Sequence, residues 1–157
     1  MLSGSTLSGC EPPEPVTTFA DVTPMLAAAE ADEAEAAEAA ARGGALFTRL
    51  GCITCHRFDD IPLNAPRLDR LGGSPVELAR RRPNGPGWET VTRTRDAAYV
   101  YESITRPQAW RVAAYRSAAA MSWFGWLEAR QVADLMLYLA MRSEDPTWIT
   151  LQANTTD

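Results

Sequence analysis

The feature that most constrains this chain is the run Cys52-Ile53-Thr54-Cys55-His56. Two cysteines stand three positions apart, and the histidine that follows them is the only histidine in the 157 residues. Two thiols and an imidazole packed into five residues form a local site for chemistry. Any fold of this chain must present these three side chains from one short turn.

The pattern CxxCH is the attachment signature of c-type haem. The thiols of Cys52 and Cys55 would each add across one vinyl group of the porphyrin, and two intervening residues let one helical turn reach both groups. The adjacent His56 is then held under the iron as its proximal ligand. The motif therefore predicts one covalently attached haem c as the cofactor.

Three alternatives remain open for the same residues. A redox disulfide between Cys52 and Cys55 usually lies in a thioredoxin-like βαβ setting, which the sequence lacks. A structural zinc site needs a second pair of Cys or His ligands, whereas only Cys10 remains. A simple structural disulfide is the third alternative, and it would make the chain a non-haem subunit.

The composition is that of a globular protein with an uneven distribution of charge. The chain is 46% hydrophobic and 22% charged, and its length fits one domain, or one domain with a tail. No run approaches the ~18 apolar residues of a membrane-spanning helix. Residues 1–41 are acidic and contain no basic side chain, whereas the remainder is mildly basic. The net charge of −5 does not suggest nucleic-acid binding.

The run Leu7-Ser8-Gly9-Cys10 resembles a bacterial lipobox, in which the cysteine is acylated after a signal peptide is removed. No basic n-region and no apolar h-region precede it here, so a free cysteine in a tail is the alternative. The run Glu11–Pro15 that follows is a stiff, solvated tether. Two acyl chains on Cys10 would anchor the protein firmly, at ~0.8 kcal/mol for each buried methylene.

Residues 25–42 consist largely of Ala and Glu, which favours a helix. We expect Asp21 or Thr23 to cap this helix, with Pro24 in its first turn, and the pair Gly43-Gly44 to break it or mark the start of the domain. The stretch has almost no large apolar face, so we expect it to project into solvent as a spacer. The predicted organisation is therefore a tether over residues 1–42, a domain over 43–143 and a tail over 144–157.

The domain is expected to be mostly α-helical, with long loops. Helices are predicted over residues 97–104, ending near Arg106-Pro107, and over 128–142. The second of these has apolar residues at helical spacing, at Val132, Leu135, Met136 and Leu139. A short amphipathic helix from Ala45 leads into Cys52. No stretch alternates clearly enough to predict a strand.

On these residues the chain resembles a class I cytochrome c, especially the small haem domains of bacterial terminal oxidases and other respiratory complexes. The segment Gly44–His56 is similar to the first helix and haem motif of that family, and residues 132–139 are similar to its last helix. The run 101–107 is similar to a helix that ends in a proline in oxidase-type domains. The resemblance implies that Leu135 and Tyr138 pack against Gly44 and Phe47.

The resemblance also implies the groups around the iron. The carbonyl of Pro66 would accept a hydrogen bond from Nδ1 of His56 and so fix its tautomer. Met121 would be the second axial ligand, in a chain that has no second histidine and no lysine. The family usually places a proline after this methionine, whereas Ser122 follows here. The alternative is that Met121 merely packs and the sixth position is open.

Other residues are candidates for the haem propionates. Trp110, Tyr101 and Tyr99 each carry a hydrogen-bond donor. The run Arg80-Arg81-Arg82 opens a loop that could pair with propionates, dock an acidic partner or remain solvated.

These observations predict a one-electron carrier rather than an enzyme. A soft thioether opposite an imidazole raises the potential, and a six-coordinate iron has no vacancy for a substrate. The expected partners are redox proteins or subunits of a respiratory or photosynthetic membrane complex. The resemblance implies haem attachment outside the cytoplasmic membrane, in the periplasm or at the outer membrane face, where an anchor at Cys10 would confine the haem near its partner. A five-coordinate haem sensor or peroxidase-like protein is the alternative.

Overall fold

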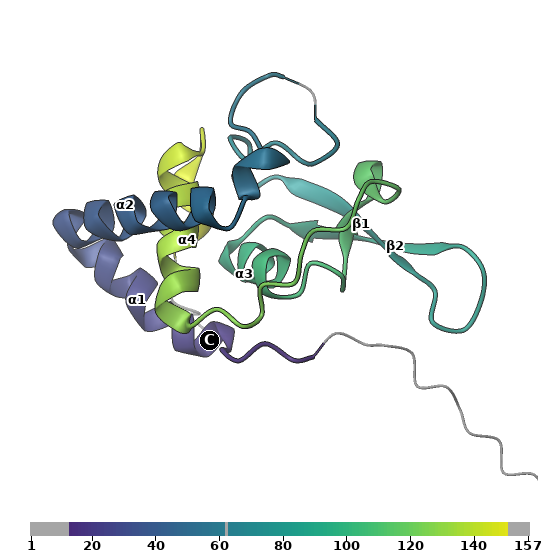
Figure 1. Ribbon diagram of the computed structural model, residues 1–157, viewed down its shortest axis with the longest axis horizontal. Helices are drawn as coiled ribbons and strands as arrows, with labels where there is room; N and C mark the ends of the chain where they lie inside the picture. The colour runs from purple at the N-terminus through teal and green to yellow at the C-terminus, as the bar shows by residue number, and fades with distance from the viewer. Residues whose placement is uncertain (1–12, 62, 151–157) are drawn as a thin grey trace, which may run out of the picture.

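The structure is a computed structural model that describes residues 13–61 and 63–150 (Figure 1). Its main elements within these residues are the helices α1 (Phe19–Ala31), α2 (Glu33–Arg49), α3 (Ala97–Thr105) and α4 (Ala129–Arg142). Three short 3-10 helices complete the helical part, namely η1 (Cys52–Thr54), η2 (Ala113–Tyr115) and η3 (Pro146–Ile149). The mostly α-helical fold class is therefore confirmed. The two helices predicted in the second half of the chain correspond to α3 and α4.

Two capping interactions define the first pair of helices. The Thr18 side chain accepts a hydrogen bond from the N–H of Asp21, and the Asp21 carboxylate accepts one from the N–H of Thr18. This reciprocal box begins α1. Asp32 ends α1 and caps α2, because its carboxylate accepts from the N–H groups of Ala34 and Glu35. The chain reverses at this residue, and α1 and α2 form a hairpin of helices (Figure 1).

The prediction of a single solvated helix over residues 25–42 is wrong. It is wrong in where the helix begins and ends, and in its exposure to solvent. Pro24 lies inside α1, and Gly43 and Gly44 continue α2 instead of breaking it. The boundary expected between residues 42 and 43 falls inside α2. Alanine-rich faces of these helices are buried together with a few larger residues, in a set that comprises Val22, Leu26, Ala29, Ala39 and Ala40. Small side chains let helices approach closely, so such a face is buried without a broad apolar stripe.

The close contact between α2 and α4 forms the centre of the fold. A β-carbon placed on Gly44 would lie 3.0 Å from the ring of Tyr138, and the ring centroids of Phe47 and Tyr138 are 5.4 Å apart. Leu135 is buried in the same core. The packing of Tyr138 against Gly44 and Phe47 is therefore confirmed.

The expectation that the chain contains no strand is wrong. Strands β1 (Pro75–Arg81) and β2 (Trp88–Thr94) form an antiparallel hairpin, and β3 (Arg111–Val112) pairs with the other edge of β1. Figure 1 shows this hairpin extending away from α1, α2 and α4. Arg80 and Arg81 belong to β1 rather than to a loop. Their guanidinium groups lie over the rings of Trp110 and Trp88, and Arg80 also pairs with Glu89.

A segment before α1 straps the domain, and we call residues 14–18 the N-terminal strap. The N–H of Val16 donates to the carbonyl of Gly125 at 2.7 Å, and the hydroxyl of Tyr101 donates to the carbonyl of Thr17. Arg106 lies 3.3 Å from the carboxylate of Glu14. These contacts tie the strap to α3 and to the segment that precedes α4.

The residues that follow α4 fold back onto it. Trp148 in η3 is 4% exposed, so this part of the expected tail packs on its own chain. Across the described residues, no helix has the length and apolarity needed to cross a membrane. The predicted lipid-bearing Cys10 lies outside those residues.

Candidate functional site

The cysteines and the histidine are presented by a tight turn at the end of α2. Gly51 adopts a left-handed conformation with φ of 77°, which redirects the chain into η1. The N–H groups of Cys55 and His56 both donate to the carbonyl of Cys52, at 3.2 and 2.9 Å. The three side chains of the motif therefore lie on one turn, as the spacing predicts.

Cys52 and Cys55 carry free thiols and are not bonded to each other. Cys55 is exposed and Cys52 is half-buried. Burial raises the pKa of the Cys52 thiol, and the neighbouring Cys55 raises it further. A raised pKa disfavours the thiolate that attacks disulfides, so Cys52 is poorly suited to be a redox nucleophile. Among the described residues, no three His, Cys, Asp or Glu side chains converge as a zinc site would require.

The imidazole of His56 is oriented by a backbone carbonyl. Its Nδ1 lies 2.9 Å from the carbonyl oxygen of Pro66, which confirms the expected hydrogen bond. A carbonyl can only accept, so Nδ1 carries the proton and the lone pair of Nε2 is left for a metal. Burial lowers the pKa of His56, although the bond to Pro66 partly opposes the shift. The lowered pKa favours the neutral imidazole that a metal ligand must be.

An ion-pair cluster holds the loop that carries Pro66. Arg67 bonds to the carboxylates of Asp60 and Asp69, and Asp69 is 4% exposed. The guanidinium lowers the pKa of Asp69, so this buried carboxylate stays charged. The carbonyl of Asp69 accepts from the N–H of Glu144 at 2.7 Å, just beyond α4. The loop that orients His56 is thereby fixed to the helical core.

Sequence reasoning missed Phe58, which packs against the hydrophobic core. Its ring centroid is 5.7 Å from those of both Phe47 and Tyr138, and the Arg142 guanidinium lies 4.9 Å from it. The available signal was its position two residues after His56. Phe58 joins the turn of the motif to the contact between α2 and α4.

A cavity of about 480 Å³ lies beside the loop that follows the motif. Asn64 from that loop lines it together with the segment before Met121, represented by Ala114, Tyr115, Ser117, Ala118 and Ala119. It is an open hollow, and neither the residues of the motif nor Met121 itself lines it. The structure thus brings the segment leading to Met121 opposite the loop that follows His56.

Met121 is half-buried on the irregular segment between η2 and α4. Its carbonyl accepts a hydrogen bond from Nε2 of Gln108 at 2.7 Å, a residue that sequence reasoning missed. Two residues further on, the indole N–H of Trp123 is buried and has no partner within the described parts of the chain. The hydroxyl of Thr17 and the indole N–H of Trp148 are likewise buried without a partner in these parts, so the orphaned donor of Trp123 does not by itself mark a ligand.

Apolar side chains around the motif are also left in solvent. Ile53 is 55% exposed and Ile61 is 52% exposed, and Leu63 is exposed nearby in sequence. Exposed apolar side chains this close in sequence to the motif can contact a ligand or a partner. Together with two free thiols and an oriented imidazole, they fit a large and mainly apolar group.

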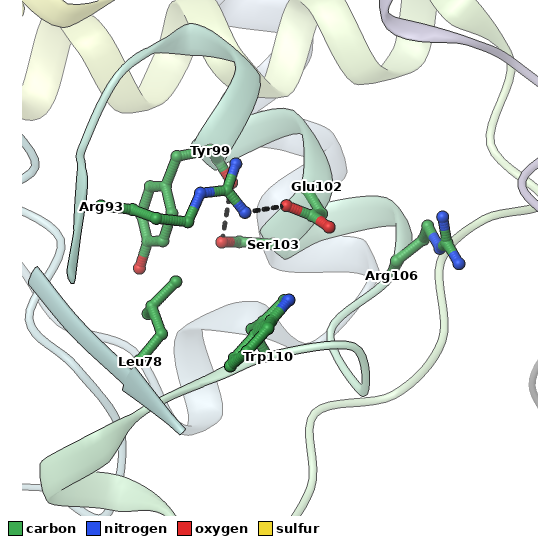
Figure 2. Close-up of a pocket in the computed structure, with 7 residues that line it drawn as sticks. All are labelled: Leu78, Arg93, Tyr99, Glu102, Ser103, Arg106 and Trp110. Carbon is green, nitrogen blue, oxygen red and sulfur yellow. Dashed lines mark hydrogen bonds and ion pairs between the residues drawn. The ribbon is translucent and has the colours of Figure 1, made fainter. Parts of the chain in front are cut away.

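Some of the residues expected to contact the propionates have other surroundings in the structure. Tyr101 gives its hydroxyl proton to Thr17, so no proton remains for a propionate, and the role expected for Tyr101 is not supported. Trp110 and Tyr99 line a separate cavity of about 10 Å³ between β1 and α3 (Figure 2). That volume is about the minimum for one water molecule. The role of Trp110 stays a prediction.

Comparison with known proteins gives one kind of match. A family model described as Cytochrome c matches residues 40–143, which include the motif, Pro66, Met121 and α4. No curated protein and no solved structure shows a significant match.

Proposed function

The chain belongs to the cytochrome c family, and we propose that it is a membrane-tethered one-electron carrier with histidine and methionine as axial ligands. Membership of the family means a covalently attached haem c and haem-based electron transfer. Cys52 and Cys55 would hold the porphyrin through two thioethers, and His56 would bind the iron. When bound, the haem supplies a reversible one-electron change at its iron. The residues of the chain orient this group and restrict access to it.

The observation that carries the proposal is the 2.9 Å contact between Nδ1 of His56 and the carbonyl of Pro66. This bond fixes one tautomer and one ring orientation, and it raises the basicity of Nε2. The ion pairs of Arg67 keep the loop of Pro66 in place. An imidazole held in this way would rearrange little when it served as a ligand of an iron that changes its charge by one.

Met121 is the proposed second ligand. It is half-buried, and the segment leading to it lies across the 480 Å³ cavity from the loop that follows His56. A thioether in the sixth position would exclude substrates and favour the ferrous state. The function that follows is transfer of single electrons between protein partners.

The proposed location is the outer face of the bacterial cytoplasmic membrane, in or beside a respiratory or photosynthetic complex. Its support is the lipobox-like run Leu7–Cys10 and the chemistry of haem attachment implied by the family. A lipid on Cys10 would place the domain next to membrane-bound redox partners.

The ligand assignment is tested with Met121→Ala, using Met141→Ala as the matched control because Met141 is 63% exposed on α4. Both variants are matured with haem in a bacterial periplasm. We expect Met121→Ala to lower the midpoint potential and to let the ferrous protein bind carbon monoxide. Met141→Ala should change neither property. Carbon monoxide binding by the unmodified protein would favour the five-coordinate sensor or peroxidase-like alternative.

The anchor is tested separately. Cys10→Ser should release the haem-loaded protein from the membrane fraction into the soluble periplasmic fraction, with an unchanged visible spectrum. Membrane association that persists in this variant would remove the lipid anchor from the proposal and leave the ligand assignment untouched.

A further inference from the structure

We propose that Gln108 is a positioning residue for Met121, an inference that rests on the proposed ligation of the iron by Met121. The Nε2 group of Gln108 donates to the carbonyl of Met121 at 2.7 Å. Gln108 directly follows Pro107, just beyond the end of α3. The hydrogen bond thus connects the end of a regular helix to the irregular segment that carries the ligand.

The amide of Gln108 is itself oriented by Arg111. The Nη2 group of Arg111 donates to Oε1 of Gln108 at 3.1 Å, while Nη1 donates to the carbonyls of Arg116 and Ala118, each at 3.3 Å. An arginine can only donate and a carbonyl can only accept, so these partners assign the oxygen and nitrogen of the amide without ambiguity. One guanidinium therefore holds both Gln108 and the segment leading to Met121.

The support for this network comes from the sheet. Arg111 lies in β3 and pairs with Ala79 of β1, which is 0% exposed. Ala79 lies between β2 and β3 in the three-stranded sheet, and regular elements position a ligand more accurately than loops do. The path from β1 to the Met121 carbonyl consists of strand pairing followed by two side-chain hydrogen bonds.

The local backbone gives a reason for such a restraint. Met121 is followed by Ser122, so its own backbone is not confined by a proline ring as it would be before a proline. The segment from Ala118 to Phe124 contains neither helix nor strand. A backbone of this kind depends on side-chain partners for its polar groups. Gln108 supplies a restraint on the Met121 backbone that would hold this residue in place as a ligand of the iron.

The decisive variant is Gln108→Glu, because it keeps the hydrogen bond to Arg111 and removes the one to Met121. The size of the side chain is kept, and a carboxylate still accepts from Arg111 and gains an ion pair with it. The donor toward Met121 is lost, and a negative oxygen then faces the carbonyl. The matched control is Gln131→Ala, which removes a glutamine side chain that accepts from the N–H of Glu128 at 3.0 Å at the start of α4.

The measurement is competition for the sixth position in the haem-loaded protein. Imidazole binding to the ferric form is titrated, and the iron–sulfur charge-transfer band reports the Met121 ligand directly. Loss of one neutral hydrogen bond changes an equilibrium by roughly 2- to 12-fold. We therefore expect Gln108→Glu to raise the apparent imidazole affinity by about that factor, while Gln131→Ala leaves it unchanged.

Two results would overturn the inference in different ways. Equal imidazole affinity for Gln108→Glu and for the unmodified protein, with the iron–sulfur band intact in both, would limit Gln108 to a structural role. Absence of that band from the unmodified protein would overturn ligation by Met121, and this inference with it. Gln108→Ala is measured in parallel, so that the conclusion does not depend on the added charge.

Discussion

A β-carbon on Gly43 in α2 would lie 1.9 Å from the carbonyl oxygen of Asp134 in α4. The two helices therefore cross with their backbones in direct contact at this point. The same approach brings the guanidinium of Arg42 to 2.9 Å from both carboxylate oxygens of Asp134. The crossing fixes the helix that runs directly into the Cys52 turn, so its geometry sets the position of the haem motif.

Gly43→Ala should destabilise the protein. The nearest atoms belong to the backbone of α4 and cannot move aside as a flexible side chain can. We expect a loss of at least about 1–3 kcal/mol in the free energy of unfolding, the usual range for overpacking. Denaturant unfolding measures it. Gly85→Ala is the control, because a β-carbon there meets nothing within 4 Å. Equal stability of the two variants would show that the helices do not cross this closely.

Arg42→Met should leave the Asp134 carboxylate, 10% exposed, without its main partner. The Arg42 side chain is 36% exposed, so solvent reduces the effect, and we expect a cost of about 1–3 kcal/mol. Arg130→Met is the comparison, because its contact with Glu35 is 3.9 Å long and exposed, and its removal should cost less than about 1 kcal/mol. Similar unfolding free energies for the two variants would contradict the larger contribution to stability expected from the Arg42–Asp134 ion pair.

Tyr101→Phe should change the response of the protein to alkaline pH. Burial raises the pKa of Tyr101 above its ordinary value of 10, and the nearby Asp21 and Glu14 add to the shift, whereas Thr105 and Arg106 oppose it. The fold thus favours the neutral phenol. Its contribution to stability is present below about pH 10 and is lost as the pH rises through the folded-state pKa.

The test compares unfolding free energies of the two proteins between neutral pH and about pH 12. Tyr101→Phe should lose about 0.5–1.5 kcal/mol at neutral pH, because the bond to Thr17 is gone, and should then fall less steeply above pH 10. If the unfolding free energies of the variant and the unmodified protein fell in parallel with rising pH, ionisation of Tyr101 would not affect the stability of the folded state.

Replacing both cysteines of the motif should remove covalent haem. In Cys52→Ala/Cys55→Ala, haem should extract into acidified organic solvent, because only coordination would remain to hold it. Cys10→Ser is the matched control and should retain its haem on the denatured polypeptide. Extraction of the haem from the unmodified protein would contradict thioether attachment at Cys52 and Cys55.

The parts of the site that are close in sequence could be predicted, because their geometry is set by local spacing. Cys52, Cys55 and His56 lie on one turn, and resemblance to the family was enough to pair His56 with Pro66. Gln108 carried no comparable signal. Its bond to Met121 depends on how β3 and the following segment pass one another, and that is a property of the tertiary structure.

The missed elements share a physical cause. The hairpin was not recognised because β1 buries Leu78 and Ala79 in succession, which interrupts the two-residue alternation of a half-buried strand. The expectation of a solvated helix over residues 25–42, which fall in α1 and α2, fails because alanine contributes little to an apolar stripe. Their burial depends on the close approach that small residues permit, and that approach requires a partner helix which periodicity within one segment does not reveal.

The contact of the N-terminal strap with the domain has a consequence for where electrons can travel. If Cys10 is acylated as proposed, only three residues separate it from Glu14, whose carboxylate lies 3.3 Å from Arg106 of the domain. The four Cα–Cα steps from Cys10 to Glu14 span at most roughly 14 Å. A domain held so near the bilayer pivots instead of diffusing outward. Its redox partners must then present their electron-exchange sites close to the lipid headgroups. The domain and its partners would meet by diffusion in the plane of the membrane.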